Sequence, residues 1–171
     1  PVSRSPNGRG LSRKHISEAL HQSLKRLQLD YLDLYFCHRY DPDTPIEEVV
    51  RTMTDLIHQG KILYWGTSEW GAARIMEAHG IARQYGLIPP AMEQPQYNLF
   101  HRKRVEMDLI PVCREIGIGL TTWSPLYFGI LSGKYNDGIP AGSRADLADH
   151  HWIIDKITPE KIAAVRQLTK L

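Results

Sequence analysis

The sequence lacks most of the features that mark specialised protein classes. Only two of its 171 residues are cysteines, so Cys37 and Cys113 cannot build a disulfide framework and fit a reducing compartment. No apolar run is long enough to span a membrane and no signal peptide is recognisable, so we expect a cytoplasmic protein without membrane insertion. Arginine tracts are absent and the net charge of +2 is spread along the chain, which argues against nucleic-acid binding.

Glycine-rich phosphate-binding turns are missing as well. No Gly-x-Gly-x-x-Gly turn follows a predicted strand, and Gly117–Gly119 opens a strand rather than a helix. The segment Gly129–Lys134 resembles a phosphate loop, but it is one residue short and Tyr135 stands where a magnesium-binding hydroxyl is needed. His150 and His151 have no cysteine or carboxylate at ligand spacing. Neither a Rossmann-type nucleotide site nor a metal site is therefore expected.

What the sequence does contain is a regular alternation of strand-like and helix-like segments. Apolar runs predict strands at residues 31–37, 62–67, 91–94 and 118–123, with helices at 12–27, 44–59, 72–85, 102–116 and from 158 onward. Residues 1–10 have no periodicity and are expected to form a loop. The strand starts recur at intervals of about 30 residues, the length of a βαβ unit. This spacing predicts a parallel α/β sheet, either doubly wound or part of a (β/α) barrel.

Local signals refine these boundaries. Thr44, Pro45 and Glu47 predict a capping box with a proline at the first helical position. Pro111 is expected to kink or restart its helix. Residues 129–152 have no regular spacing, which is typical of a functional lid or a disordered segment. The chain does not begin with methionine and its last helix leaves an apolar face without a following strand, so we expect it to be part of a longer polypeptide.

Polar or aromatic side chains follow each predicted strand at its carboxyl end. They are His38, Ser68, Gln94 and the pair Trp123 and Ser124. Because the carboxyl ends of parallel strands meet at one rim, these residues are candidates for a ligand site. The indole can stack on a flat heteroaromatic ring while Gln94 and Ser68 hydrogen-bond a carboxamide, and His38 can polarise a carbonyl. The loop residues Lys134 and Arg144 suit a phosphorylated cofactor tail.

Each of these residues also has an ordinary structural explanation. A histidine at a strand end is more often a hydrogen-bonding residue of the framework than a catalyst. Gln94 and Ser68 can form turns, and Trp123 can belong to a core. Loop lysines and arginines are usually solvated. Position at a strand end alone therefore leaves both interpretations of His38 open.

The sequences of five segments, and the order in which they occur, carry a more specific resemblance. They are GLSRKHI, SLKRLQLDYLDLYFCHRYDPDTPIEE, GKILYWGTSEW, EQPQYN and TTWSPLYFGILSGKYNDGIPAGSR. Together they closely resemble the aldo-keto reductase superfamily, in particular the branch of the potassium-channel β subunits and their bacterial and plant relatives. The resemblance implies one domain over residues 1–171 that supplies the central to C-terminal βα units of a (β/α)8 TIM barrel. It also implies a cofactor-clasping loop at residues 127–152.

The resemblance implies roles for individual residues, with NADPH/NADP+ as the cofactor. His38 matches the histidine of the catalytic tetrad; channel β subunits carry asparagine there, so this histidine is typical of an enzyme-type member. Ser68 and Gln94 would hold the nicotinamide carboxamide, and Trp123 would stack on its ring. The residues implied to contact the pyrophosphate are Ser124, Pro125 and Leu126, and those for the adenosine phosphates are Lys134, Ser143 and Arg144. Glu69 stands where other members have asparagine or arginine, which leaves its contact open.

Three members of the family's catalytic tetrad have no counterpart in this chain. The proton-donating tyrosine, the lysine and the aspartate belong to strands that precede the matched region, and four βα units make about half of a barrel. We therefore expect a parent protein that reduces aldehydes or ketones to alcohols with NADPH, acting on a small carbonyl substrate as a homo-oligomer, with a tetramer as the expected assembly. The alternatives are an NADP(H)-sensing regulatory subunit of a membrane channel and a catalytically incomplete fragment.

Overall fold

The computed structural model describes residues 8–168 and residue 170. The loop expected at residues 1–10 therefore lies largely outside the described residues. The chain divides into two compact units. We call residues 1–95 with 103–122 the sheet unit, and residues 96–102 with 123–171 the C-terminal unit.

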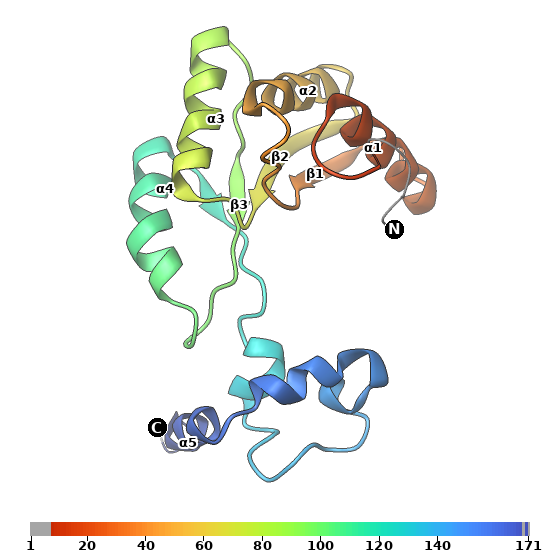
Figure 1. The fold of residues 1–171 in the computed structure, drawn as a ribbon. Helices are drawn as coiled ribbons and strands as arrows, with labels where there is room; N and C mark the ends of the chain where they lie inside the picture. Colours follow the sequence, from red (N-terminus) through yellow and green to blue (C-terminus); the bar gives the residue numbers. More distant parts are fainter. Residues whose placement is uncertain (1–7, 169, 171) are drawn as a thin grey trace. The chain divides into compact units, whose positions relative to one another are not determined.

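The sheet unit contains four parallel strands that pair in the order in which they occur along the chain (Figure 1). They are β1 (Leu32–Cys37), β2 (Ile62–Ser68), β3 (Met92–Gln94) and β4 (Gly119–Leu120). The expected parallel α/β class is confirmed. In a doubly wound sheet the strand order reverses at a switch point. Here each strand lies beside the one that precedes it in the sequence, as in a (β/α) barrel.

The strand β4 is shorter than the strand expected at residues 118–123. Pro95 follows β3 directly and has no N–H, so the ladder between the two strands loses a donor where β3 ends. Trp123 forms an isolated parallel bridge with Gln96 instead of extending β4. The indole therefore follows a short bridge rather than a continuous strand.

Four α-helices lie on one face of the sheet (Figure 1). They are α1 (Arg13–Leu27), α2 (Ile46–His58), α3 (Ala72–Tyr85) and α4 (Ile110–Ile116). The inward faces of α1, α2 and α3 are apolar, with Leu20, Val49, Met53 and Ile75 fully buried, as the helical spacing predicts. A π-helical segment, η1 (Arg104–Leu109), precedes α4. The helix changes to α geometry beside Pro111, which confirms the expected restart.

The capping box predicted for α2 is wrong. Pro45 occupies the N-cap position, and no side chain caps the helix. The Thr44 hydroxyl donates to Asp41 Oδ2 at 2.7 Å, and the Glu47 carboxylate accepts from Arg51 Nε at 2.8 Å. Both side chains are engaged elsewhere because a charged partner makes a stronger hydrogen bond than a neutral backbone N–H or hydroxyl group does.

The two faces of the sheet have different surroundings. On the helix-covered face, Trp65 and Thr67 are fully buried. On the opposite face, Leu34 and Tyr64 lie side by side on paired strands, and their exposed fractions are 41% and 57%. A (β/α) barrel turns this second face toward its interior. The sheet unit is thus consistent with part of such a barrel.

The C-terminal unit consists of short helical turns around a small core. Its elements are the 3₁₀ helices η2 (Tyr127–Ser132), η3 (Arg144–Asp146) and η4 (Ala148–Lys156), followed by α5 (Pro159–Leu168). The buried residues of the core are Tyr127, Ile130, Tyr135, Ala145, Ile153 and Val165. The segment 129–152, for which the sequence indicates no regular spacing, combines 3₁₀ turns with irregular turns at residues 133–143. It contributes Ile130, Tyr135 and Ala145 to this core.

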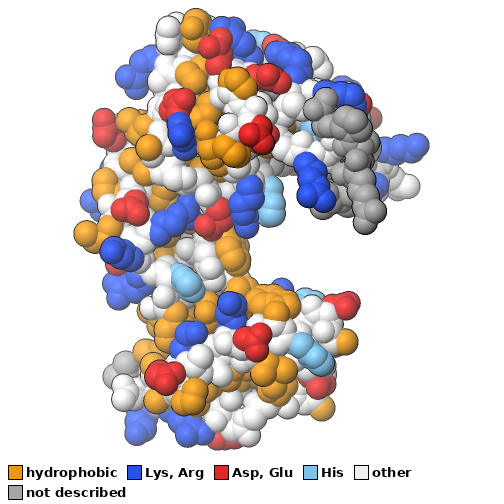
Figure 2. Space-filling view, in the orientation of Figure 1, with side chains coloured by type: hydrophobic (Ala, Val, Ile, Leu, Met, Phe, Trp, Pro, Cys, Tyr) orange, Lys and Arg blue, Asp and Glu red, His pale blue; other side chains and the backbone are white. Residues whose placement is uncertain are grey.

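Charged side chains of both signs are interspersed on the face of the protein drawn in Figure 2, without a patch of one sign. This distribution matches the spread of charge along the sequence, and that face offers no basic stripe of the kind that binds nucleic acid. Over residues 8–168 and 170, no helix combines the length and the apolar content needed to cross a bilayer.

Candidate active site

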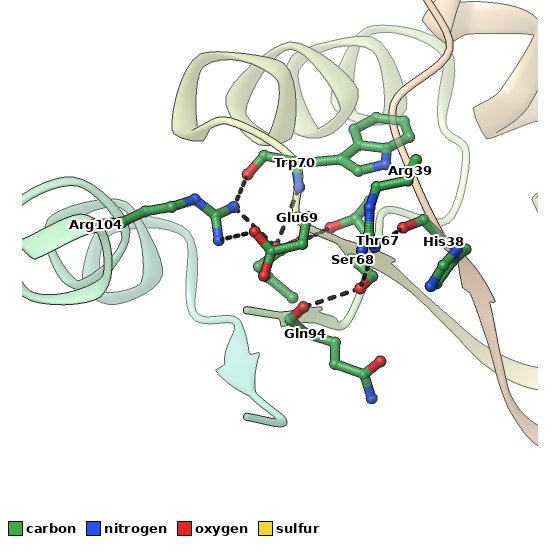
Figure 3. Close-up of polar contacts among 9 residues, drawn as sticks. His38, Arg39, Thr67, Ser68, Glu69, Trp70, Gln94 and Arg104 are labelled. Atoms are coloured by element: carbon green, nitrogen blue, oxygen red, sulfur yellow. Dashed lines mark hydrogen bonds and ion pairs between the residues drawn. The ribbon is translucent and has the colours of Figure 1, made fainter. Parts of the chain in front are cut away.

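Three of the predicted site residues meet at the carboxyl rim of the sheet (Figure 3). Ser68 and Gln94 are register partners at the ends of β2 and β3, and His38 directly follows β1. Because side chains alternate along a strand, each of the three shares the face of the residue two positions before it. A Cβ atom added to Gly66 would lie 2.8 Å from the Met92 side chain, so these two residues share a face. It is the face on which Leu34 and Tyr64 are exposed, opposite the helices. The three predicted groups therefore share one rim and one face.

Hydrogen bonds tie these strand ends together. The Ser68 hydroxyl donates to the Gln94 carbonyl oxygen at 3.0 Å. Arg39, which the sequence interpretation did not single out, donates through Nη1 to Ser68 Oγ at 3.4 Å and to the His38 carbonyl oxygen. Since its only proton is already donated, Ser68 is left to accept from a ligand N–H. The Gln94 side chain extends from the rim (Figure 3), and the Ser68 side chain is almost fully buried.

His38 lines a cavity of about 600 Å³. The exposed imidazole makes no hydrogen bond to any residue between 8 and 168, so both ring nitrogens are open to a ligand. Residues 8–11 and residues 38–41 form most of the wall of this cavity. A histidine with free ring nitrogens in a cavity is the arrangement that polarising a substrate carbonyl requires.

A buried carboxylate lies behind the rim, on the helix-covered face. The Glu93 side chain is fully buried and accepts from the Thr67 hydroxyl at 2.6 Å and from the Trp70 N–H at 3.2 Å. Arg104 Nη2 lies 3.2 Å from the same carboxylate. Burial raises the pKa of Glu93, while the Thr67 hydrogen bond and the Arg104 charge oppose that rise.

Arg104 joins this carboxylate to the turn that follows β2 (Figure 3). Its guanidinium donates to the Trp70 carbonyl oxygen at 2.6 Å and to Glu69 Oε2 at 3.0 Å. Glu69 has a left-handed backbone with φ of +58°, which is strained for a residue other than glycine. The contact of Glu69 that the sequence left open is thus an ion pair with Arg104, which holds the turn directly after Ser68.

Sequence reasoning missed Glu93 and Arg104. A signal for Glu93 was present, because a carboxylate in the middle of a short buried strand needs a partner. The partner itself could not be found from the sequence, since Arg104 lies on a helix 11 positions later and reaches the carboxylate only in the folded chain.

Five of the predicted cofactor residues line one pocket in the C-terminal unit. This pocket has a volume of about 410 Å³, and its predicted members are Ser124, Pro125, Leu126, Lys134 and Arg144. Phe128 and Gly129, which the sequence did not single out, complete its wall. Two cations and several backbone groups around one concavity are the donor set that phosphate oxygens require.

The backbone of this pocket is shaped to leave room beside Lys134. Gly129 has φ of +99°, and an added Cβ atom there would lie 2.6 Å from Lys134 Cε. Ser124 and Phe128 also have positive φ values, +51° and +61°, which cost energy in non-glycine residues. The Arg144 guanidinium lies 5.9 Å from the centre of the Phe128 ring, an arrangement that restricts this cation to one side of the pocket.

Two further predicted residues lie in the C-terminal unit outside the pocket wall. The Ser143 hydroxyl oxygen is buried and has no hydrogen-bond partner, so this side chain has an unused donor and acceptor next to Arg144. The Trp123 ring packs 6.2 Å from that of Phe128. The structure therefore brings the phosphate-type residues together in the C-terminal unit, and the rim residues together in the sheet unit.

The potential metal ligands of the chain are dispersed. In the part of the chain that the structure describes, no three His, Cys, Asp or Glu side chains are grouped as metal ligands. Both cysteines are free thiols, as expected. The groups that do gather are an imidazole, an amide and a hydroxyl at a strand rim, and the cations of a separate pocket.

A model of the Aldo/keto reductase family matches residues 2–171. The chain belongs to this family. The superfamily resemblance carried by the five sequence segments is thereby confirmed. Aldo/keto reductases are oxidoreductases that use nicotinamide cofactors, a cofactor class that requires both the amide-binding and the phosphate-binding groups described above.

Proposed function

We propose that this aldo/keto reductase chain is the NADPH-binding and His38-bearing part of an enzyme that reduces aldehydes or ketones to alcohols. The observation that carries the proposal is the pocket at η2, which is lined by five of the residues that the family resemblance implies as cofactor contacts. Its two cations match the charge of a phosphorylated cofactor, and NADPH carries one phosphate more than NADH.

The residues around this pocket fit such a cofactor. Lys134 and Arg144 pair with phosphate oxygens, and the unpartnered Ser143 hydroxyl adds a donor. Ser124, Pro125 and Leu126 contact the pyrophosphate, and Trp123 stacks on the nicotinamide. Ser68 accepts from the carboxamide N–H₂ because its own proton is donated to Gln94, while the Gln94 side chain donates to the carboxamide oxygen.

His38 is the catalytic residue that this chain contributes. One free ring nitrogen donates a hydrogen bond to the substrate carbonyl oxygen, which orients and polarises it. The bound cofactor supplies the hydride for the carbonyl carbon. We assign the proton-donor role to no tyrosine of residues 8–168. Residues 1–171 form one partial barrel domain with its cofactor-clasping loop at 127–152.

The finer placement of the protein follows from the quoted segments. We assign it to the potassium-channel β-subunit-like branch, as an enzyme-type member because His38 replaces the asparagine of the channel subunits. The assembly that this branch suggests is a cytoplasmic homo-tetramer.

The role of His38 is tested by His38→Ala in the full-length protein, with NADPH and 4-nitrobenzaldehyde as substrates. We expect kcat/KM to fall by about 10²- to 10⁴-fold, the range for loss of a positioned acid–base group, with the NADPH dissociation constant unchanged. His21→Ala is the matched control, because His21 is exposed on α1 and makes no contact with the rim. An unchanged kcat/KM in His38→Ala would remove the catalytic role.

The same assay separates the enzyme from its main alternative. Multiple rapid turnovers by the wild-type protein support a reductase. A protein that retains NADPH tightly but turns over slowly or not at all would instead be an NADP(H)-sensing regulatory subunit.

A further inference from the structure

The cavity at His38 is walled by two segments that are far apart in the sequence. Residues 8–11 form one side and residues 38–41 the other, with His15 from the first turn of α1 between them. The volume of about 600 Å³ is enough for a small aromatic or phosphorylated carbonyl compound. All of these residues belong to the sheet unit.

Asp41 fastens the two walls to each other. Its Oδ2 accepts from the Leu11 N–H at 2.7 Å and from the Thr44 hydroxyl at 2.7 Å, and its Oδ1 accepts from the Asp43 N–H at 3.0 Å. Gly10 approaches so closely that an added Cβ atom would lie within contact distance of this carboxylate. Burial alone would raise the pKa of Asp41, but these three hydrogen bonds lower it. Asp41, the carboxylate among the residues that line this cavity, therefore accepts hydrogen bonds from both walls.

The remaining charged and titratable groups of the wall are donors without acidic partners. Among the described residues, no carboxylate forms an ion pair with Arg9 or Arg39. Arg39 makes hydrogen bonds only through Nη1, so its Nε and Nη2 groups remain unpaired. The imidazoles of His15 and His38 also have no hydrogen-bond partner in residues 8–168. The cavity wall thus carries two guanidinium groups against the single carboxylate of Asp41, an excess of positive charge, together with several free donors.

We infer that the carbonyl substrate of this protein carries an anionic group, a carboxylate or a phosphate ester, that binds to Arg9 and Arg39 while His38 holds the carbonyl oxygen. The inference rests on the proposed reductase function and adds the substrate class. A carboxylate or phosphate accepts from the flat guanidinium fork through two parallel hydrogen bonds. A neutral aldehyde offers no negative charge to either guanidinium group.

The first test compares two aldehydes of nearly equal shape in the full-length protein. 4-Carboxybenzaldehyde carries the anion, 4-formylbenzamide is its neutral counterpart, and 4-formylphenyl phosphate tells whether phosphate serves better than carboxylate. We expect the wild-type kcat/KM to be higher for the anionic aldehydes, and this preference to shrink as salt is added.

The arginines are then removed one at a time, as Arg39→Met and Arg9→Met. Each change should lower the ratio of kcat/KM for anionic over neutral aldehyde by about fivefold, the effect of losing one partly exposed charge pair. Arg114→Met is the matched control, because Arg114 is exposed on α4 away from this cavity, and its ratio should equal that of the wild type. The ratio cancels any general loss of activity that Arg39→Met causes through Ser68.

Two results would overturn the inference. One is a wild-type protein that reduces both aldehydes equally well. The other is a ratio that stays unchanged in both arginine variants. If no aldehyde is reduced at all, the proposed function fails by itself, and calorimetric titration of 4-carboxybenzaldehyde still decides the anion site. Binding that Arg9→Met and Arg39→Met weaken supports the site, and equal binding by the variants and the wild type contradicts it.

Discussion

Arg104→Met is expected to destabilise the sheet unit through the carboxylate of Glu93. The methionine keeps most of the aliphatic stem but removes every donor that reaches Trp70, Glu69 and Glu93. Glu93 is fully buried, whereas 33% of the Arg104 side chain is exposed. Breaking a buried pair by removing one partner costs about 3–5 kcal/mol. Because water reaches Arg104, we place the loss of unfolding free energy at the lower end, about 3 kcal/mol.

A double-mutant cycle with Glu93→Gln tests whether this loss comes from the carboxylate of Glu93. Glutamine keeps an acceptor for the Trp70 N–H, so this single change should cost only about 1 kcal/mol. In the Glu93→Gln background, Arg104→Met leaves no uncompensated charge and should cost about 1 kcal/mol more. The two changes are therefore expected to couple by about 2 kcal/mol. Urea denaturation followed by circular dichroism at pH 7 measures all four proteins. Additivity within about 0.5 kcal/mol would refute the reasoning.

The same variants give a pH test with a definite sign. The folded-state pKa of Glu93 lies above its ordinary value because of burial, so the folded protein binds this proton more readily than the unfolded chain does. The cost of the buried carboxylate is therefore present at neutral pH and is relieved as pH falls toward the unfolded pKa. Arg104→Met removes a group that lowers this pKa, so its deficit relative to wild type should shrink as the pH falls from neutral toward the ordinary pKa of a glutamate. A deficit that does not change with pH, or a deficit whose pH dependence is the same in the Glu93→Gln background, contradicts the mechanism.

Two further predictions concern packing and thiol chemistry. Gly66→Ala places a Cβ atom 2.8 Å from the Met92 carbonyl oxygen and 2.9 Å from Phe36 Cε1, so the strands must move apart. The free energy of unfolding measured in urea should fall by about 1–3 kcal/mol. An unchanged urea midpoint would show that the sheet accommodates the methyl group without cost. Burial raises the pKa of the Cys37 thiol strongly and that of the Cys113 thiol less. Ellman's reagent at pH 8 should therefore modify Cys113 at least about tenfold faster than Cys37 in the native protein, and both equally in denaturant. Equal native rates would contradict the burial of Cys37.

Much of the framework could be predicted from short-range patterns. The helical face of Leu20 and Leu24, and the apolar run that becomes β1, need only local periodicity because each element buries one stripe or face. The predicted capping box was wrong because the Thr44 hydroxyl donates to Asp41 instead of accepting from a backbone N–H of α2, and a sequence window contains no information on which of these partners a hydroxyl will meet. The strand at 118–123 was overestimated because its length depends on the partner strand, which Pro95 ends.

The candidate site also contains residues that the sequence could predict and residues that it could not. His38, Ser68 and Gln94 were predictable because a parallel sheet collects strand ends at one rim, and the pocket residues from Ser124 to Arg144 were recognisable from the family's segments. Arg39, Arg104 and Glu93 were not, because their roles depend on which groups meet across the sheet. The Arg9 side of the His38 cavity also required the fold, since residues 8–11 and 38–41 are far apart in the sequence and are joined by the hydrogen bond from Leu11 to Asp41.

By itself the sequence determined the class of element at each position, the rim at which its polar strand ends collect, and the family to which the chain belongs. All three follow from local periodicity and from the order of short segments. Only the tertiary structure decided that Glu93 is a buried carboxylate held by Arg104. It also decided that Arg9 and Arg39 line the cavity of His38 without an ion-pair partner among residues 8–168. Those properties arise from desolvation and from contacts between distant segments, which no stretch of sequence specifies alone.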